Sequence, residues 1–188
     1  MKLPIRKPTR LPDYDYSSPG AYFVTMCCQN RNPYFDFPPA KRMVESVWRN
    51  LPRRFANIKL DVFVVMADHF HGILILKPHV GEALVASRDF GEPANGRIVG
   101  EALVASRDFG EREGTSPSPT VAVPDIIGAF KSETTWQYSL GVKNNNWPPY
   151  SGKLWQRSFY DHVIRNDEDL RILREYIVNN PAALEMGD

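Results

Sequence analysis

Two histidines stand one residue apart in His69-Phe70-His71, at the start of an apolar run. Residues i and i+2 of a β-strand point to the same face of the sheet, so both imidazoles would project together while Phe70 points to the apolar side. Two imidazoles on one face are suited to hold a single divalent metal ion. The alternative is a pair of unrelated strand histidines, and the spacing alone does not decide between the two.

A second pair of polar residues lies near the C-terminus. Tyr176 and Asn180 are four residues apart, which places them on one face of a helix. A tyrosine hydroxyl can act as a nucleophile, and a carboxamide oxygen is a suitable ligand for Mg²⁺ or Mn²⁺. The helix pattern alone favours another interpretation, in which Tyr176 packs in the core beside Ile177 and Asn180 simply ends the helix before Pro181.

Positive charge and aromatic rings occur at several further places. The cations that we consider for nucleic-acid binding are Arg6, Lys7, Arg10, Lys131 and Arg157, the last within the aromatic stretch WQRSFY. Mixtures of guanidinium groups and flat rings suit phosphates and unstacked bases. Ordinary solvated surface explains them equally well.

Alternating periodicities predict the elements that must position these residues. Strands are predicted at 21–29, 59–67, 69–76 and 154–164, and helices at 39–51, 123–140 and 167–179, with Gly141 and Pro181 just beyond two helix ends. The order β-α-β-β-α-β-α begins with the ferredoxin-like split β-α-β pattern. We therefore expect an α+β fold, in which a four-stranded antiparallel sheet has helices on one face and an added C-terminal helix carries Tyr176.

Composition places the chain among ordinary soluble domains. It has 188 residues, of which 43% are hydrophobic, and no apolar run is long enough to span a membrane. No secretory signal is recognisable, and the adjacent Cys27 and Cys28 would point to opposite faces of a strand, which disfavours a disulfide. We expect a cytoplasmic protein without a membrane partner.

A duplicated segment interrupts this pattern. The sequence VGEALVASRDFGE occurs at 80–92 and again, without a difference, at 99–111. Residues 80–114 carry a net charge of −3, which leaves +4 on the remainder, a mild basic bias compatible with a polyanionic partner. We interpret about 78–122 as an exposed, mostly disordered insertion within a single domain that spans 1–188.

Taken together, these residues resemble the single-tyrosine HUH transposases (transposase IS200-like), and in particular the transposases associated with repetitive extragenic palindromes (REP-associated tyrosine transposases). The matching segments, in the family's order, are VFVVMADHFHGILI, IIGAFKS, LWQRSFYDHVIRNDEDL and REYIVNNP. The resemblance implies that His69 and His71 bind a divalent metal, that Asn180 completes the protein ligands, and that Tyr176 is the nucleophile. It places His162 in a recurrent family segment, where it is a possible supporting residue without an assigned chemical role.

The function that the resemblance implies is DNA transposition. Such an enzyme is a Mg²⁺- or Mn²⁺-dependent endonuclease and strand transferase that acts on single-stranded DNA at hairpins through a 5′-phosphotyrosine intermediate, as a monomer or a homodimer. One alternative is a domesticated, non-catalytic protein that binds hairpin DNA. Another is a metal-dependent phosphoesterase on the same fold, which would not need Tyr176.

The duplicated segment generates the first prediction. Replacing residues 80–118 by a short Gly/Ser linker should leave the rest of the chain folded, because changing the length of a loop costs little free energy. Expression and thermal denaturation of the deletion variant test this. Loss of soluble protein with a cooperative unfolding transition would contradict the interpretation of this segment as an insertion.

Overall fold

Four strands and three helices follow one another in the predicted order. The computed structural model describes residue 11 and residues 13–78 and 121–185. The strands are β1 (Gly20–Cys27), β2 (Ile58–Val65), β3 (His69–Leu76) and β4 (Tyr160–Ile164). The helices are α1 (Pro38–Arg54), α2 (Val123–Asn145) and α3 (Asp167–Glu185), and a 3-10 turn, η1 (Gln29–Arg31), follows β1.

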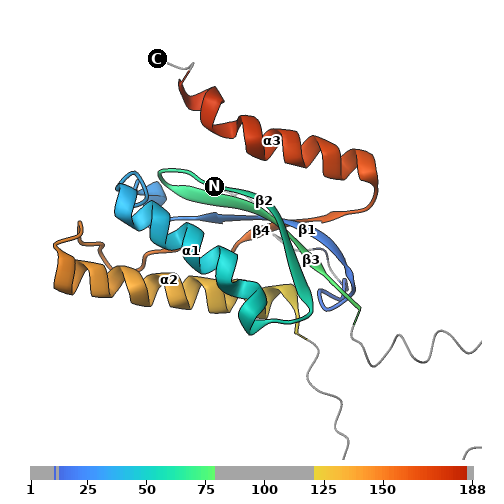
Figure 1. Ribbon diagram of the computed structural model, residues 1–188, viewed down its shortest axis with the longest axis horizontal. Coiled ribbons are helices and arrows are strands. Elements are labelled where there is room, and N and C mark those ends of the chain that lie inside the picture. The colour runs from blue at the N-terminus through green and yellow to red at the C-terminus, as the bar shows by residue number, and fades with distance from the viewer. Residues whose placement is uncertain (1–10, 12, 79–120, 186–188) are drawn as a thin grey trace, which may run out of the picture. The chain divides into compact units, whose positions relative to one another are not determined.

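The four strands form one antiparallel sheet in the order β2-β3-β1-β4. Helices α1 and α2 lie side by side on one face of this sheet, and α3 lies on the opposite face (Figure 1). The predicted α+β fold with a four-stranded sheet is therefore confirmed. The additional helix α3 covers the other face of the sheet. Both histidines are expected to point toward this face.

The core lies between the sheet and the helices α1 and α2. Phe70, in the middle of the two-histidine motif, is fully buried, and its ring lies 4.6 Å from the ring of Trp48 in α1 and 5.3 Å from that of Phe130 in α2. Burial of large aromatic rings is a major source of folding free energy. Because Phe70 faces this core, the period of two in β3 turns His69 and His71 to the other side.

Gly72 lets α1 approach the sheet closely. A Cβ atom at this position would lie 2.9 Å from Cζ2 of Trp48 and 2.7 Å from Cε1 of Phe70. Both distances are shorter than the van der Waals contact of two carbon atoms. The glycine after the two histidines therefore serves the packing of the opposite face.

All three helices end later than the sequence predicts, and α2 and α3 pass through the residues expected to end them. Gly141 does not end α2; it lies inside the helix, where a Cβ atom would come within 2.3 Å of Cδ2 of Trp147. The helix ends at Asn146, whose φ of 53° is the left-handed conformation common after a helix. Similarly, α3 continues through Pro181 to Glu185, since a proline near the end of a helix removes only one of its hydrogen bonds.

The strand predicted at 154–164 is wrong in its first half, because β4 begins only at Tyr160. Leu154, Trp155 and Phe159 are buried all the same, and Trp155 forms an isolated bridge with Cys28 beyond the end of β1. Apolar residues in this segment are thus buried by packing under α2 rather than by regular pairing with a neighbouring strand. A hydrophobic run alone does not distinguish these two cases.

Further expectations concern the duplicated insertion, the N-terminal basic residues, the two cysteines and membrane-spanning helices. The predicted insertion lies outside the described residues, apart from its ends, as do Arg6, Lys7 and Arg10. Cys27 and Cys28 are both buried free thiols. In the described part of the chain, no helix has the length and apolar character needed to cross a membrane.

The close approach at Gly72 generates a prediction. Gly72→Ala should destabilise the fold by about 1–3 kcal/mol, because the added methyl group collides with two buried rings. Gly128→Ala is the matched control: nothing lies within 4 Å of its Cβ position on α2, so it should be neutral or stabilise by up to about 1 kcal/mol. Chemical denaturation measures both, and equal stabilities of the two variants would contradict the proposed packing.

Candidate functional site

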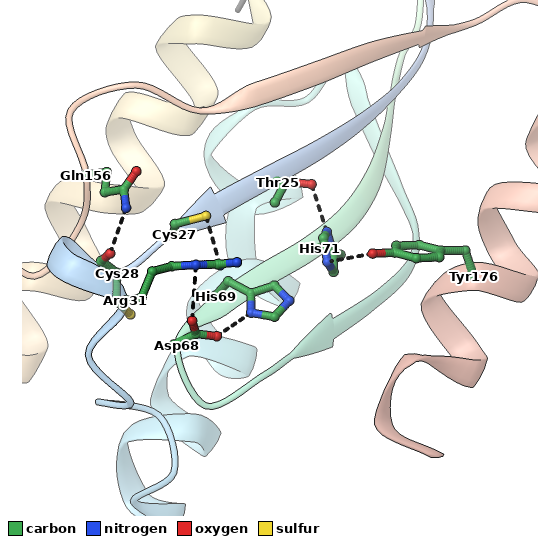
Figure 2. Close-up of polar contacts among 9 residues, drawn as sticks. All are labelled: Thr25, Cys27, Cys28, Arg31, Asp68, His69, His71, Gln156 and Tyr176. Carbon is green, nitrogen blue, oxygen red and sulfur yellow. Dashed lines mark hydrogen bonds and ion pairs between the residues drawn. The ribbon is translucent and has the colours of Figure 1, made fainter. Parts of the chain in front are cut away.

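The two histidines of β3 lie close together on the face of the sheet that α3 covers. The centroids of the His69 and His71 rings are 4.7 Å apart and the ring planes are nearly perpendicular. Figure 2 shows both imidazoles pointing away from the sheet into the space beside α3. The structure thus brings together the two residues that the sequence predicts as metal ligands.

His71 is held by β1, the neighbouring strand. Thr25 is its cross-strand partner, and the Thr25 hydroxyl lies 2.7 Å from Nδ1 of His71. The ring also stacks on Phe23, with 5.4 Å between the ring centroids. Burial, together with the neighbouring His69, lowers the pKa of His71 to about 4. The imidazole is therefore neutral near pH 7 and keeps the lone pair that a metal ligand needs.

His69 is oriented by a carboxylate. Nδ1 of His69 lies 2.5 Å from Oδ1 of Asp68, and the second oxygen of Asp68 pairs with Arg31 at 3.3 Å. A carboxylate only accepts hydrogen bonds, so Nδ1 carries a proton and Nε2 is the nitrogen that could bind a metal. Arg31 also donates to the sulfur of Cys27, which fixes the guanidinium beside the site (Figure 2).

The side chain of Tyr176 extends from α3 to the ring of His71. Its hydroxyl oxygen lies 3.5 Å from Nε2 of His71, and its ring meets the His71 ring edge-on at 5.3 Å between centroids (Figure 2). A second edge contact joins Tyr176 to Phe23. The side chain is 49% exposed. It is therefore not the core residue that the helix pattern alone suggests, and its hydroxyl can meet a ligand from solvent.

The position of α3 is fixed at two points along its length. At its start, Oδ1 of Asn166 accepts a hydrogen bond of 2.8 Å from the backbone N–H of Asp169, which makes Asn166 the N-cap. Nε2 of His162 lies 2.8 Å from the carboxylate of Asp169, and this hydrogen bond holds the pKa of Asp169 below its usual value. His162 thus supports the beginning of the helix that carries Tyr176.

The second point lies close to Tyr176. Arg174 makes hydrogen bonds through two of its nitrogens to the carboxylate of Asp61 in β2, one of them 3.1 Å long. A guanidinium and a carboxylate joined in this way have a defined relative orientation. Arg174 therefore sets the rotation of α3 two residues before the tyrosine.

Asn180 follows Tyr176 by one turn of α3 and is half-buried. Among the described residues, no hydrogen bond joins Asn180 to either histidine or to Tyr176. Its part in a ligand set stays a prediction.

The donor atoms at this site are two imidazole nitrogens, which can serve as ligands of one divalent metal ion. Two imidazoles on one face, each with its Nδ1 in a hydrogen bond, are oriented as metal-ligating histidines commonly are. No cluster of three or more His, Cys, Asp or Glu side chains suited to a metal occurs within residues 13–78 and 121–180. An amide, water or substrate oxygens could complete the ligands of such a site, and the identity of the metal stays a prediction.

The remaining basic candidates divide into two groups. Lys131 in α2 donates to the carbonyl oxygens of Gln156 and Ser158 at 2.9 and 2.8 Å, so its ammonium group holds the segment before β4 against the helix. Arg157, in that same segment, is exposed to solvent. Contact of either residue with nucleic acid stays a prediction, as it does for Arg6, Lys7 and Arg10.

The sequence analysis missed Thr25, Arg31 and Asp68. Asp68 directly precedes His69, and an acidic residue beside a candidate ligand was a usable signal. Thr25 depends on the register between β1 and β3. Arg31 depends on the turn after β1, where both Asn30 and Arg31 have positive φ angles. Neither feature can be read from the sequence pattern.

The support of His69 generates a prediction. Asp68→Asn should weaken Mn²⁺ binding by about 10- to 100-fold, because a neutral amide accepts a weaker hydrogen bond from Nδ1 of His69 and no longer pairs with Arg31. Calorimetric titration of the folded protein without DNA measures the affinity. Asp36→Asn, which removes an exposed carboxylate elsewhere, should bind Mn²⁺ like the unmodified protein. Equal affinities for all three proteins would show that Asp68 has no such part.

Comparison with known proteins bears on the fold of the chain. No family model matches the chain. An uncharacterized protein of Haemophilus influenzae is 29% identical over 188 residues, which cover 96% of this chain and 90% of that protein. A solved structure of a REP-associated tyrosine transposase bound to a REP hairpin superposes with a TM-score of 0.53 at 18% identity, covering 93% of this chain and 73% of the other. The chain therefore has the fold of a REP-associated tyrosine transposase, as the resemblance in its sequence predicts.

Proposed function

We propose that this protein is a transposase that cuts and rejoins single-stranded DNA at hairpins, with Tyr176 as the nucleophile. The observation that carries the proposal is the placement of the Tyr176 hydroxyl 3.5 Å from Nε2 of His71, beside His69. A helix from the end of the chain thus presents a half-exposed hydroxyl to two imidazoles on a buried strand. The fold likeness to a hairpin-bound transposase supports the same reaction class.

The chemistry assigned to Tyr176 is attack on a phosphodiester. Its oxygen forms a bond to phosphorus while the bond from phosphorus to the 3′ oxygen breaks. The tyrosine loses its proton, and the departing strand gains one to leave with a 3′-hydroxyl group. The strand downstream of the cut stays joined to the protein through its 5′ phosphate. A 3′-hydroxyl can later attack this linkage, so rejoining needs no external energy source.

His69 and His71 would hold the divalent ion through their Nε2 atoms, and Asn180 is the proposed third protein ligand. When bound, Mg²⁺ or Mn²⁺ polarises the phosphate and offsets the charge that develops on its oxygens. The neutral state of His71 suits this task, because a protonated imidazole has no lone pair to share. Asp68 and Thr25 keep the two rings in place before the substrate arrives.

The surroundings of Tyr176 favour a single-stranded substrate. In-line attack requires a phosphate whose backbone can bend toward the hydroxyl, and an unpaired strand bends more easily than a duplex. The site combines the half-exposed ring of Tyr176 with the exposed Arg31, which pairs with Asp68 next to His69. Cations of this kind attract phosphate without selecting a base sequence.

A covalent adduct tests the proposal. The protein is incubated with Mn²⁺ and a pool of end-labelled stem-loop oligonucleotides whose unpaired flanks are randomised, and then analysed on a denaturing gel. The unmodified protein should form an adduct that carries the downstream fragment only. Tyr176→Phe should form none, although its ring still packs on His71 and Phe23. His69→Ala should also lose the adduct, because one of the two imidazoles is missing.

Tyr160→Phe is the matched control. Tyr160 is a similarly exposed tyrosine, at 56%, and it lies at the start of β4. An adduct that survives in Tyr176→Phe but disappears in Tyr160→Phe would show that the nucleophile is misassigned. Cleavage without any adduct would favour a phosphoesterase, and hairpin binding without cleavage would favour a non-catalytic DNA-binding protein.

A further inference from the structure

A groove lies between α2 and the segment that precedes β4, outside the site described above. It has a volume of about 460 Å³, and its lining includes Lys131, Thr135, Trp136, Lys153, Trp155 and Arg157. Its lining residues include three cations and no acidic side chain. A groove of this charge attracts a polyanion.

Trp136 is the unusual residue of this groove. Its side chain is 59% exposed although indole is a large, mainly apolar group. By contrast, Trp155 is buried and donates its N–H to the hydroxyl of Thr134. Trp136 therefore contributes little to the core and presents a ring to whatever enters the groove. Exposed aromatic rings beside cations are the usual platforms for unpaired bases.

The cations of the groove are available for a ligand to different degrees. Lys153 and Arg157 are exposed, and neither has a carboxylate partner within the described part of the chain. Lys131 is committed to two carbonyl oxygens, so it shapes the groove and adds charge without being free to move. The two exposed cations are thus the ones that can contact phosphates.

Hydrogen bonds to the backbone of β1 and the residue after it connect the segment that contains Arg157 to the sheet end that carries the candidate active site. The N–H of Gln156 donates to the carbonyl of Cys27 at 2.9 Å, and its side chain donates to the carbonyl of Cys28 (Figure 2). Cys27 is the cross-strand partner of His69. One end of the sheet therefore supports both the imidazoles and one wall of the groove.

From this geometry we infer that the groove binds an unpaired nucleotide of single-stranded DNA, whose base stacks on Trp136 and whose phosphates contact Lys153 and Arg157. The inference rests on the proposed function and adds to it a second place of contact for the DNA strand. An acidic peptide would pair with the two cations equally well, but its carboxylates would not stack on the exposed indole of Trp136.

The experiment distinguishes contacts of the protein with the base from contacts with the phosphates. Binding of fluorescently labelled oligo(dT) and of a strand of the same length made of abasic sites is measured by anisotropy. The unmodified protein should prefer oligo(dT). Trp136→Ala should weaken oligo(dT) binding by about 5- to 100-fold and leave binding of the abasic strand unchanged, while Trp136→Phe should keep most of the preference. Arg157→Ala should weaken both strands alike and reduce the salt dependence by about one phosphate contact.

Leu140→Ala and Lys143→Ala are matched controls, because both residues are exposed on α2 and lie outside the groove. They should bind both strands like the unmodified protein. Unchanged oligo(dT) affinity in Trp136→Ala would overturn the inference, and so would equally tight binding of poly-glutamate or no binding of oligo(dT) at all.

The adduct assay keeps the two proposals apart. If Tyr176 forms its adduct but Trp136→Ala binds oligo(dT) normally, the groove is misassigned and the proposed reaction stands. If the groove variants behave as expected but the unmodified protein forms no adduct with the stem-loop pool, the proposed reaction fails and the nucleotide site stands.

Discussion

The contact between Tyr176 and His71 is the interaction on which the candidate site depends. It joins α3 to β3, through two residues 105 positions apart in the sequence, across the face of the sheet opposite α1 and α2 (Figures 1 and 2). Burial of His71 also keeps its imidazole neutral, which suits a metal ligand. The helix that carries the proposed nucleophile thus lies against one of the proposed ligands, so moving α3 would alter both at once. His162 and Arg174, which hold α3 at two points, matter for this reason.

Much of this architecture can be predicted from the sequence, because it follows from local periodicity. The alternation in β3 separates Phe70 from the two histidines, and the structure confirms that they lie on opposite faces of the sheet. The order of strands and helices is confirmed as well. The sequence pattern does not predict the residues that hold the two histidines in position. Thr25 reaches His71 through strand register, and Arg31 reaches Asp68 through a turn with positive φ angles.

The incorrect predictions have a common physical cause. The intrinsic preferences of Gly141 and Pro181 predict helix ends, but both helices continue past them. Gly141 leaves room for the ring of Trp147, and Pro181 removes only one hydrogen bond from α3. Likewise, the apolar residues of 154–159 pack under α2 without forming a strand. The exposure of Trp136 also escapes the pattern, since a tryptophan in an amphipathic helix is usually buried.

The most direct test of whether the two histidines and Tyr176 form one metal-binding site is the effect of paramagnetic Mn²⁺ on the NMR signals of histidine and tyrosine rings. The account predicts that a small fraction of Mn²⁺ broadens the ring signals of His69, His71 and Tyr176 first. Tyr138, which is buried in α2 on the other face of the sheet, should keep its signal longest. If Tyr176 stays sharp while both histidines broaden, or if the histidines stay sharp, the two imidazoles and the tyrosine do not form one metal-binding site.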